Sequence, residues 1–199
     1  MLTLSVTTQG TTEPVSVALA VAHVRSDSAD ENQLLELYIT AARERCEVFT
    51  GRTIVPRTYQ LKAPRFEDVS QLPGGPINAI SSVTYYDENN ALQTLSNTVY
   101  KLSGDYFSLA HDQEWPVTNG NKITINYTAG YPVGMCPGGL RAAILLYVGD
   151  MFAVRESQIV GVSAIKNETA EALLWPFVLN PLGLVLVTHD AEPVPYARW

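Results

Sequence analysis

Residues 30–52, with the sequence DENQLLELYITAARERCEVFTGR, form the strongest helix signal in the chain. Apolar side chains recur there every three or four residues, which places them on one side of a helix with about 3.6 residues per turn. They are Leu35, Ile39, Ala42, Cys46 and Phe49. Ser28 or Asp30 can cap the first turn, and Gly51 stands where a left-handed residue commonly ends a helix. The pattern predicts a helix that buries this stripe against an apolar partner.

The opposite side of this helix carries the polar residues Glu36, Arg43 and Glu47. Arg43 and Glu47 are one turn apart and can form a surface ion pair, which is worth about 0.2–0.5 kcal/mol. We therefore expect this side of the helix to face water or another subunit.

Three further helices are predicted, at residues 15–25, 137–155 and 168–175. Pro137 can open the second of these because the first helical position needs no backbone donor, and Pro176 ends the third. Residues 140–154 are apolar nearly all round, so this helix is the natural partner for the stripe on residues 30–52.

Between the helices, residues 53–131 have the composition and alternation of β-strands. Strands are predicted at 53–61, 77–86 and 122–127, with a short pair around Gly104 and Asp105. Turn residues separate these strands, and nothing indicates a βαβ crossover. The predicted fold class is α+β, a small bundle of about four helices with an inserted antiparallel β-region and extended terminal arms.

The two ends of the chain are predicted to form arms outside a central domain of residues 15–177. Residues 1–14 alternate weakly and suggest a strand that needs a sheet edge to pair with. In the C-terminal arm, 178–199, residues 182–187 form an apolar run of strand length that would aggregate if left unpaired. It can complete the sheet of its own chain or add to the sheet of another protein, and the sequence does not separate these alternatives.

The composition excludes several classes of function. The formal net charge of -7 argues against a protein that grips nucleic acid, because such binding depends on clustered Lys and Arg. An acidic surface suits a protein that DNA passes without sticking. No apolar run approaches the length of about 20 residues that crosses a bilayer, and residues 1–15 lack the features of a signal peptide. We expect a protein that is made in the cytoplasm and has no membrane partner.

The sequence predicts no catalytic residues, no cofactor and no metal site. His23, His111 and His189 lack metal-ligand spacing, and there is no nucleophile elbow, Walker loop or dinucleotide fingerprint. Cys46 is expected to be a buried apolar residue, and a bridge to Cys136 is possible only on the count of cysteines. The carboxylates of residues 27–47 are explained by a solvated helix face. Tyrosines 85, 86, 127 and 131 are expected to pack in the sheet rather than stack on bases.

Several segments together closely resemble a family of tailed-phage head-tail connector proteins, the adaptors that attach below the portal. The resemblance covers roughly residues 14–177. Its first part consists of HVR at 23–25, DE at 30–31, LL at 34–35, Ile39, AA at 41–42 and EVFTGR at 47–52. It continues through LPGGPI at 72–77, SVTYYD at 82–87, YTAGY at 127–131, and Pro137 with LRAAILL at 140–146. Residues 155–167 and the chain after Phe177 depart from the shared pattern.

The resemblance implies a structural protein of the virion neck, with a helical bundle and an inserted β-region. It implies a ring, commonly dodecameric, that sits on the portal, docks the stopper or tail, and lets DNA pass through its lumen. Such a ring is a head-to-tail assembly of copies. Candidate interaction residues are Glu36, Arg43, Glu47, Leu182, Leu184, Val185, Leu186, Val187, Tyr196, Arg198 and Trp199.

Two other functions remain open at this point. The protein could be another neck or tail component, such as a stopper or tail terminator. It could also be a small hydrolase whose catalytic residues gather only in three dimensions. If acidic side chains line a DNA passage, changing Glu36 and Glu47 to Lys should hinder packaging or ejection without unfolding the domain.

Overall fold

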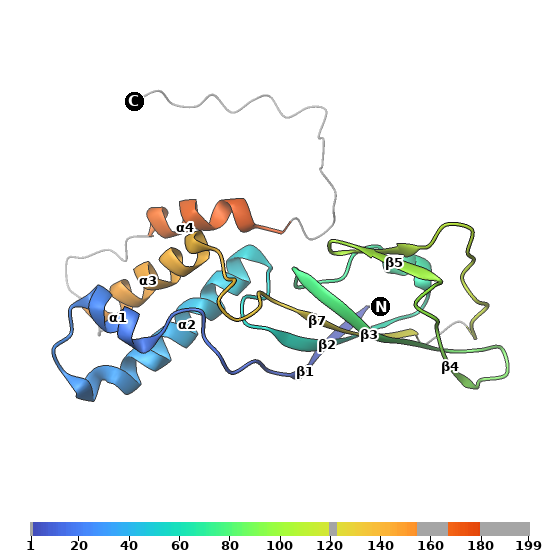
Figure 1. The fold of residues 1–199 in the computed structure, drawn as a ribbon, viewed down its shortest axis with the longest axis horizontal. Helices are drawn as coiled ribbons and strands as arrows, with labels where there is room; N and C mark the ends of the chain where they lie inside the picture. Colours follow the sequence, from blue (N-terminus) through green and yellow to red (C-terminus); the bar gives the residue numbers. More distant parts are fainter. Residues whose placement is uncertain (1, 120–122, 155–166, 180–199) are drawn as a thin grey trace, which may run out of the picture.

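The computed structural model describes residues 2–119, 123–154 and 167–179. The α-helices gather at one end of an elongated molecule, and the β-strands occupy the other end (Figure 1). The helices are α1 (Val17–Val24), α2 (Asn32–Thr50), α3 (Gly138–Ala153) and α4 (Glu168–Leu174). The β-region lies between α2 and α3 in the sequence, so the predicted α+β class with an inserted antiparallel sheet is confirmed.

The stripe on α2 is buried as predicted. Leu35, Ala42 and Cys46 have no exposed surface, Ile39 is 2% exposed, and Phe49 is half-buried. The hydroxyl of Ser28 accepts a hydrogen bond from Asp30 N in a short 3₁₀ helix (Ala29–Glu31) that leads into α2. Gly51 ends α2 with φ 68°, and its N–H donates to Glu47 O at 2.8 Å. Local sequence signals therefore set both ends of this helix.

The partner of the α2 stripe is α3, as expected. Five side chains of α3 are buried in the same apolar core: Leu140, Ala143, Ile144, Tyr147 and Val148. Helices α1 and α4 close the core by contributing Ala20, Ala170 and Leu174. Burial of each large aliphatic side chain is worth roughly 1.5–3 kcal/mol, so this core gives the helical end its stability.

The main sheet has five antiparallel strands in the order β1-β2-β7-β3-β4. They are β1 (Thr3–Thr8), β2 (Arg57–Ala63), β3 (Ile77–Tyr86), β4 (Leu92–Thr94) and β7 (Ile123–Ala129). A separate hairpin consists of β5 (Tyr100–Ser103) and β6 (Tyr106–Leu109), joined at Gly104 with φ 61°. The predicted N-terminal strand thus finds its edge on β2.

A second apolar core covers one face of this sheet. The alternation predicted for β7 places Ile123, Ile125 and Tyr127 in it, all fully buried. Phe66, from a short 3₁₀ helix (Phe66–Asp68), stacks on Trp115 with 4.6 Å between ring centroids. The Tyr127 ring stacks on Tyr59 at 5.5 Å, and its hydroxyl donates to Pro73 O at 2.9 Å. The expected packing role of this tyrosine is confirmed.

Several predicted boundaries differ from the observed ones by a few residues, and two of these differences involve prolines. The strand expected at residues 53–61 begins only at Arg57, because residues 53–56 cross from α2 to the sheet. Thr53 N donates to Gly74 O at 3.1 Å there, and Pro56 has no N–H to donate to a strand. At the other boundary, α4 ends at Leu174, and Pro176 lies within a 3₁₀ turn (Trp175–Phe177) that follows it.

Candidate interaction site

Four charged side chains meet where the helical bundle joins the sheet. Arg43 of α2 lies between two carboxylates, with its Nε 3.1 Å from Glu13 Oε2 and its Nη1 2.9 Å from Glu47 Oε2. Glu47 Oε2 also accepts a hydrogen bond from Arg57 Nη2 of β2 at 2.7 Å. We call Glu13, Arg43, Glu47 and Arg57 the junction cluster.

Glu47 also fixes the backbone that connects α2 to the sheet. Its Oε1 atom accepts hydrogen bonds from Ile54 N at 2.7 Å and from Val55 N at 3.3 Å. Glu13 reaches the cluster from the segment between β1 and α1. One carboxylate therefore ties together the end of α2, the crossing segment and the start of β2, while Arg43 ties in the N-terminal segment.

The prediction that Arg43 and Glu47 lie on a solvated face of α2 is wrong. Their side chains are only 8% and 10% exposed, because the N-terminal segment and β2 cover this side of α2. Burial alone would lower the pKa of Arg43, but hydrogen bonds and charges from Glu13 and Glu47 raise it above its ordinary value. The expected Arg43–Glu47 pair exists, as a buried pair. Glu36 is exposed, as predicted.

The remaining candidates from the sequence are not brought together by the fold. Residues 182–187, Tyr196, Arg198 and Trp199 lie outside the described residues. His23 and His111 are exposed in different parts of the molecule, and His189 is also outside the described part. Within residues 2–119, 123–154 and 167–179, no group of three or more His, Cys, Asp and Glu side chains could hold a metal ion. No helix of these ranges is long and apolar enough to cross a membrane.

Both cysteines are free thiols in the structure, so the possible bridge between them is not formed. Cys46 is fully buried in the helical core, and Cys136 is half-buried beside it. Burial raises the pKa of Cys46 to about 12 and that of Cys136 to about 11. A protonated thiol is a poor nucleophile, so neither residue has the properties of a reactive cysteine.

We expect alkaline pH to destabilise the fold partly through Cys46. The unfolded chain loses the thiol proton near pH 9, whereas the folded chain retains it up to about pH 12. The free energy of unfolding therefore falls as the pH rises from about 9 to 12. Below pH 9, Cys46 makes its full contribution to the stability of the fold. Urea unfolding of Cys46→Ala and of the parent at pH 8 and pH 10 measures this. The parent should lose more stability between the two pH values than the variant, and equal losses would contradict the assignment.

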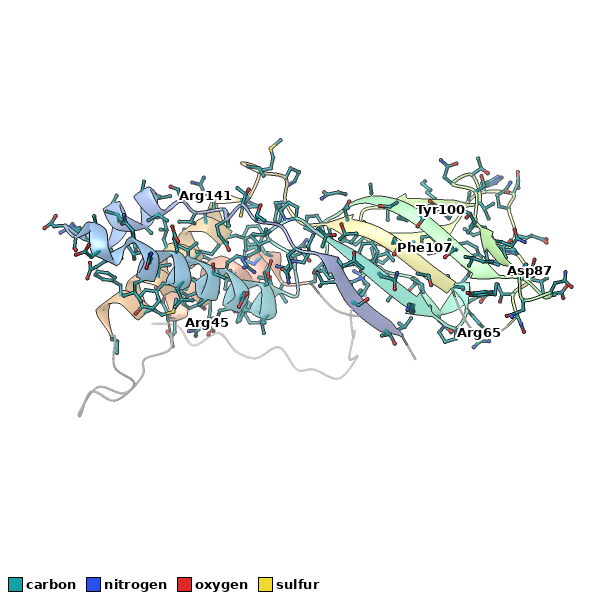
Figure 2. All side chains as sticks on the ribbon, turned by 90° about the horizontal axis from the view of Figure 1, so that it is seen from below. Arg45, Arg65, Asp87, Tyr100, Phe107 and Arg141 are labelled. Carbon is teal, nitrogen blue, oxygen red and sulfur yellow. The ribbon has the colours of Figure 1, made fainter. Side chains whose placement is uncertain are left out.

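Two hollows flank the junction between the helical end and the sheet. One, of about 270 Å³, is lined by Glu13, Pro56, Tyr131, Cys136 and Arg141 among others. Arg141 is marked on the helical side of the junction in Figure 2. The other, of about 340 Å³, lies between the end of α2 and residues 71–74, and Val178 and Leu179 also line it. Neither hollow gathers the set of acid, base and nucleophile that a hydrolase needs.

Apolar side chains along β1 are exposed, which the sequence did not predict. In β1 and just before it, Leu2, Leu4 and Val6 are 48%, 41% and 41% exposed, although β1 is part of the sheet. Val133 and Met135 also project from the loop before α3, at 72% and 71% exposure. The alternation of β1 was visible in the sequence, but the position of β1 at an open edge depends on the sheet order.

Comparison with solved structures identifies chains of the same fold. A chain in the virion of a native gene transfer agent (GTA) particle matches with a TM-score of 0.72 and 22% identity, covering 91% of this chain and 98% of that one. A chain in the neck of the empty GTA particle, computed with C6 symmetry, matches at 0.68 and 21% over 92% of this chain and 98% of that one. This chain shares their fold.

A third match is a chain in the neck of the native GTA particle, computed with C12 symmetry. Its TM-score is 0.63 at 20% identity, with 89% of this chain and 98% of that chain covered. No family model matches this sequence, and no curated protein matches it. The shared fold nevertheless extends over nearly the whole of each neck chain. It agrees with the resemblance to head-tail connector proteins and with the α+β architecture expected from it.

Proposed function

We propose that this protein is a structural component of a phage-like virion neck, where it forms a homo-oligomeric ring. The observation that carries the proposal is the near-complete fold match to chains of a particle neck with C6 and C12 symmetry. The helical bundle with an inserted sheet is also the architecture that the sequence resemblance implies.

In the more specific form of the proposal, the protein is the head-tail adaptor. A dodecameric ring sits on the portal, the stopper or tail docks on its other side, and DNA passes through its lumen. The symmetry of the C12 neck supports the dodecamer. The net charge of -7 supports a lumen that repels DNA rather than binding it.

A stopper or tail terminator is the second candidate because the matched neck structures do not separate these roles. The proposal also assigns a binding role to the C-terminal arm, residues 178–199. We propose that the apolar run at 182–187, together with Tyr196, Arg198 and Trp199, contacts the portal or an adjacent copy. A chain truncated after residue 180 should then lose binding to one of them, whereas unchanged ring formation and portal binding would exclude this role for the arm.

Native mass spectrometry of the purified protein, alone and mixed in turn with the portal protein and with a tail protein of the same particle, tests the proposed function. We expect a closed ring, formed either by the protein alone or on the portal, with a mass that gives the number of copies. A monomer or dimer that ignores the portal but binds a tail protein would transfer the assignment to a stopper or terminator. A monomer that binds neither would overturn the neck assignment.

A further inference from the structure

Among the residues that the structure describes, the main sheet has an open edge on both sides. β1 forms one edge, its six residues are all exposed, and β2 is its only partner within that part of the chain. On the other side, β4 pairs with β3 only at residues 84–86, and Leu95 N donates to Val83 O. The N–H of Ile77 donates to the carboxylate of Asp105 at 3.0 Å. Residues 78–82 of β3 therefore have no strand on their outer side within the described part of the chain.

Both edges have an irregular register, at residues 6–8 of β1 and residues 77–82 of β3, but neither carries charge or proline against pairing with another chain. Edge strands are commonly blocked by charged residues or proline. β1 has the sequence TLSVTT and residues 78–82 have the sequence NAISS, so both lack charge and proline. β1 also presents Leu4 and Val6, each 41% exposed, along its length. An accessible, uncharged edge with apolar side chains is suited to the addition of another strand.

The directions of the two edges are compatible in a head-to-tail assembly. β1, β2, β7 and β3 are each antiparallel to the next, so β1 and β3 run in opposite directions. If the axis of the proposed ring runs along the strands, rotation about it preserves the direction of every strand. The β1 strand of a rotated copy therefore lies antiparallel to β3 of its neighbour. Because the two edges are different surfaces, the contact repeats from copy to copy and can close into a ring.

The faces of the two edges also match. Leu4 pairs with Leu61 and Val6 pairs with Tyr59, so these apolar side chains lie on the face of the sheet that holds the second core. On the other edge, Ile77 and Ile80 of β3 are half-buried against the same core. If the sheet continued from β3 into the β1 strand of the next copy, Leu4 and Val6 would lie beside Ile80. Their exposed surface would then be covered.

We propose that β1 of one copy pairs antiparallel with residues 78–82 of β3 in the next copy, which joins the sheets of the ring into one continuous β-structure. This inference rests on the proposed ring and assigns the surfaces that form it. The occupant of the β3 edge is a second copy of this chain. Exposed side chains on the face opposite the core provide positions for a probe, because Ser5 pairs with Gln60 and Ala79 pairs with Thr128 there.

Cysteine cross-linking of the assembled ring tests this contact. In a Cys136→Ser background, Ala79→Cys is combined with Thr3→Cys or with Ser5→Cys, and rings are treated with a short bis-maleimide. Diagonal neighbours across strands lie about 7–8 Å apart, so this reagent tolerates a small difference in register. We expect a denaturing gel to show covalent oligomers extending beyond the dimer, because each copy is linked to two neighbours.

The matched control combines Ser5→Cys with Thr94→Cys on β4, which is exposed and lies at the same side of the sheet. This pair and each single cysteine should give no products beyond the dimer. If native mass spectrometry shows a ring but neither test pair gives longer products, or if the β4 control gives them equally, the β1–β3 contact is overturned and the ring remains. If no ring forms alone or on the portal, the proposed function fails and this inference fails with it.

Discussion

Replacing Glu47 with alanine should destabilise the fold by about 3–5 kcal/mol, because it leaves two arginines without their shared carboxylate in a buried site. Glu47 is 10% exposed, lies 2.9 Å from Arg43 Nη1 and 2.7 Å from Arg57 Nη2, and accepts the N–H groups of Ile54 and Val55. Urea unfolding followed by circular dichroism measures the loss. Glu36→Ala is the matched control on the exposed side of α2 and should change the free energy of unfolding by less than about 0.5 kcal/mol.

The junction cluster also changes how a charge reversal should be interpreted. The expectation that lysine at positions 36 and 47 leaves the fold intact fails for Glu47, since the new ammonium group would stand beside Arg43 and Arg57. A packaging defect in the double variant would therefore be explained by unfolding of the protein and would not show that these residues face DNA. Glu36→Lys alone tests whether this exposed surface faces passing DNA. If Glu47→Ala unfolded at the same urea concentration as the parent, the cluster would not hold the junction.

The elements that could be predicted from the sequence are those specified by nearby residues. The stripe on α2 follows from the helical period, its end follows from Gly51, and the buried alternation of β7 follows from the strand period. Each of these signals lies within the element that it describes or directly beside it. For this reason the helices, most strands and the α+β class were accessible without a structure.

The junction cluster could not be predicted because its members come from distant parts of the chain. Arg43 and Glu47 fit a solvated helix face until Glu13 and Arg57, 30 residues before Arg43 and 10 residues after Glu47, are brought onto them. The open edges of β1 and β3 could not be predicted for the same reason. A strand can be recognised from its own residues, but its position in the sheet order depends on all the other strands. Arg43 and Glu47, two of the charged residues proposed for an interface, are therefore buried in the junction cluster, and the exposed apolar edge of β1 was not predicted.

Replacing Gly130 with alanine should destabilise the protein by about 2–6 kcal/mol, because the residue has an unfavourable backbone conformation for a side chain and no space for one. Gly130 follows β7 with φ 116°, its N–H donates to Pro76 O, and its carbonyl accepts from Asn78 Nδ2. An added Cβ would lie 2.7 Å from Pro56 Cα and 2.9 Å from Pro56 N. These are backbone atoms of the segment that Glu47 holds, so they cannot move without disturbing the junction.

Gly134→Ala provides the matched control four residues further along the same loop. Gly134 also has a positive φ, 81°, but an added Cβ would meet nothing within 4 Å. Only the cost of the unfavourable backbone conformation applies at Gly134, and we expect the free energy of unfolding to fall by about 1–2 kcal/mol. Thermal and urea unfolding of both variants separates the cost of the backbone conformation from the cost of the steric contact with Pro56. If the two substitutions cost the same, close packing of the crossing segment on Gly130 contributes nothing, and the junction depends on the charged cluster instead of on backbone contact. If Gly130→Ala costs more, as we expect, both features hold the helical bundle on the sheet.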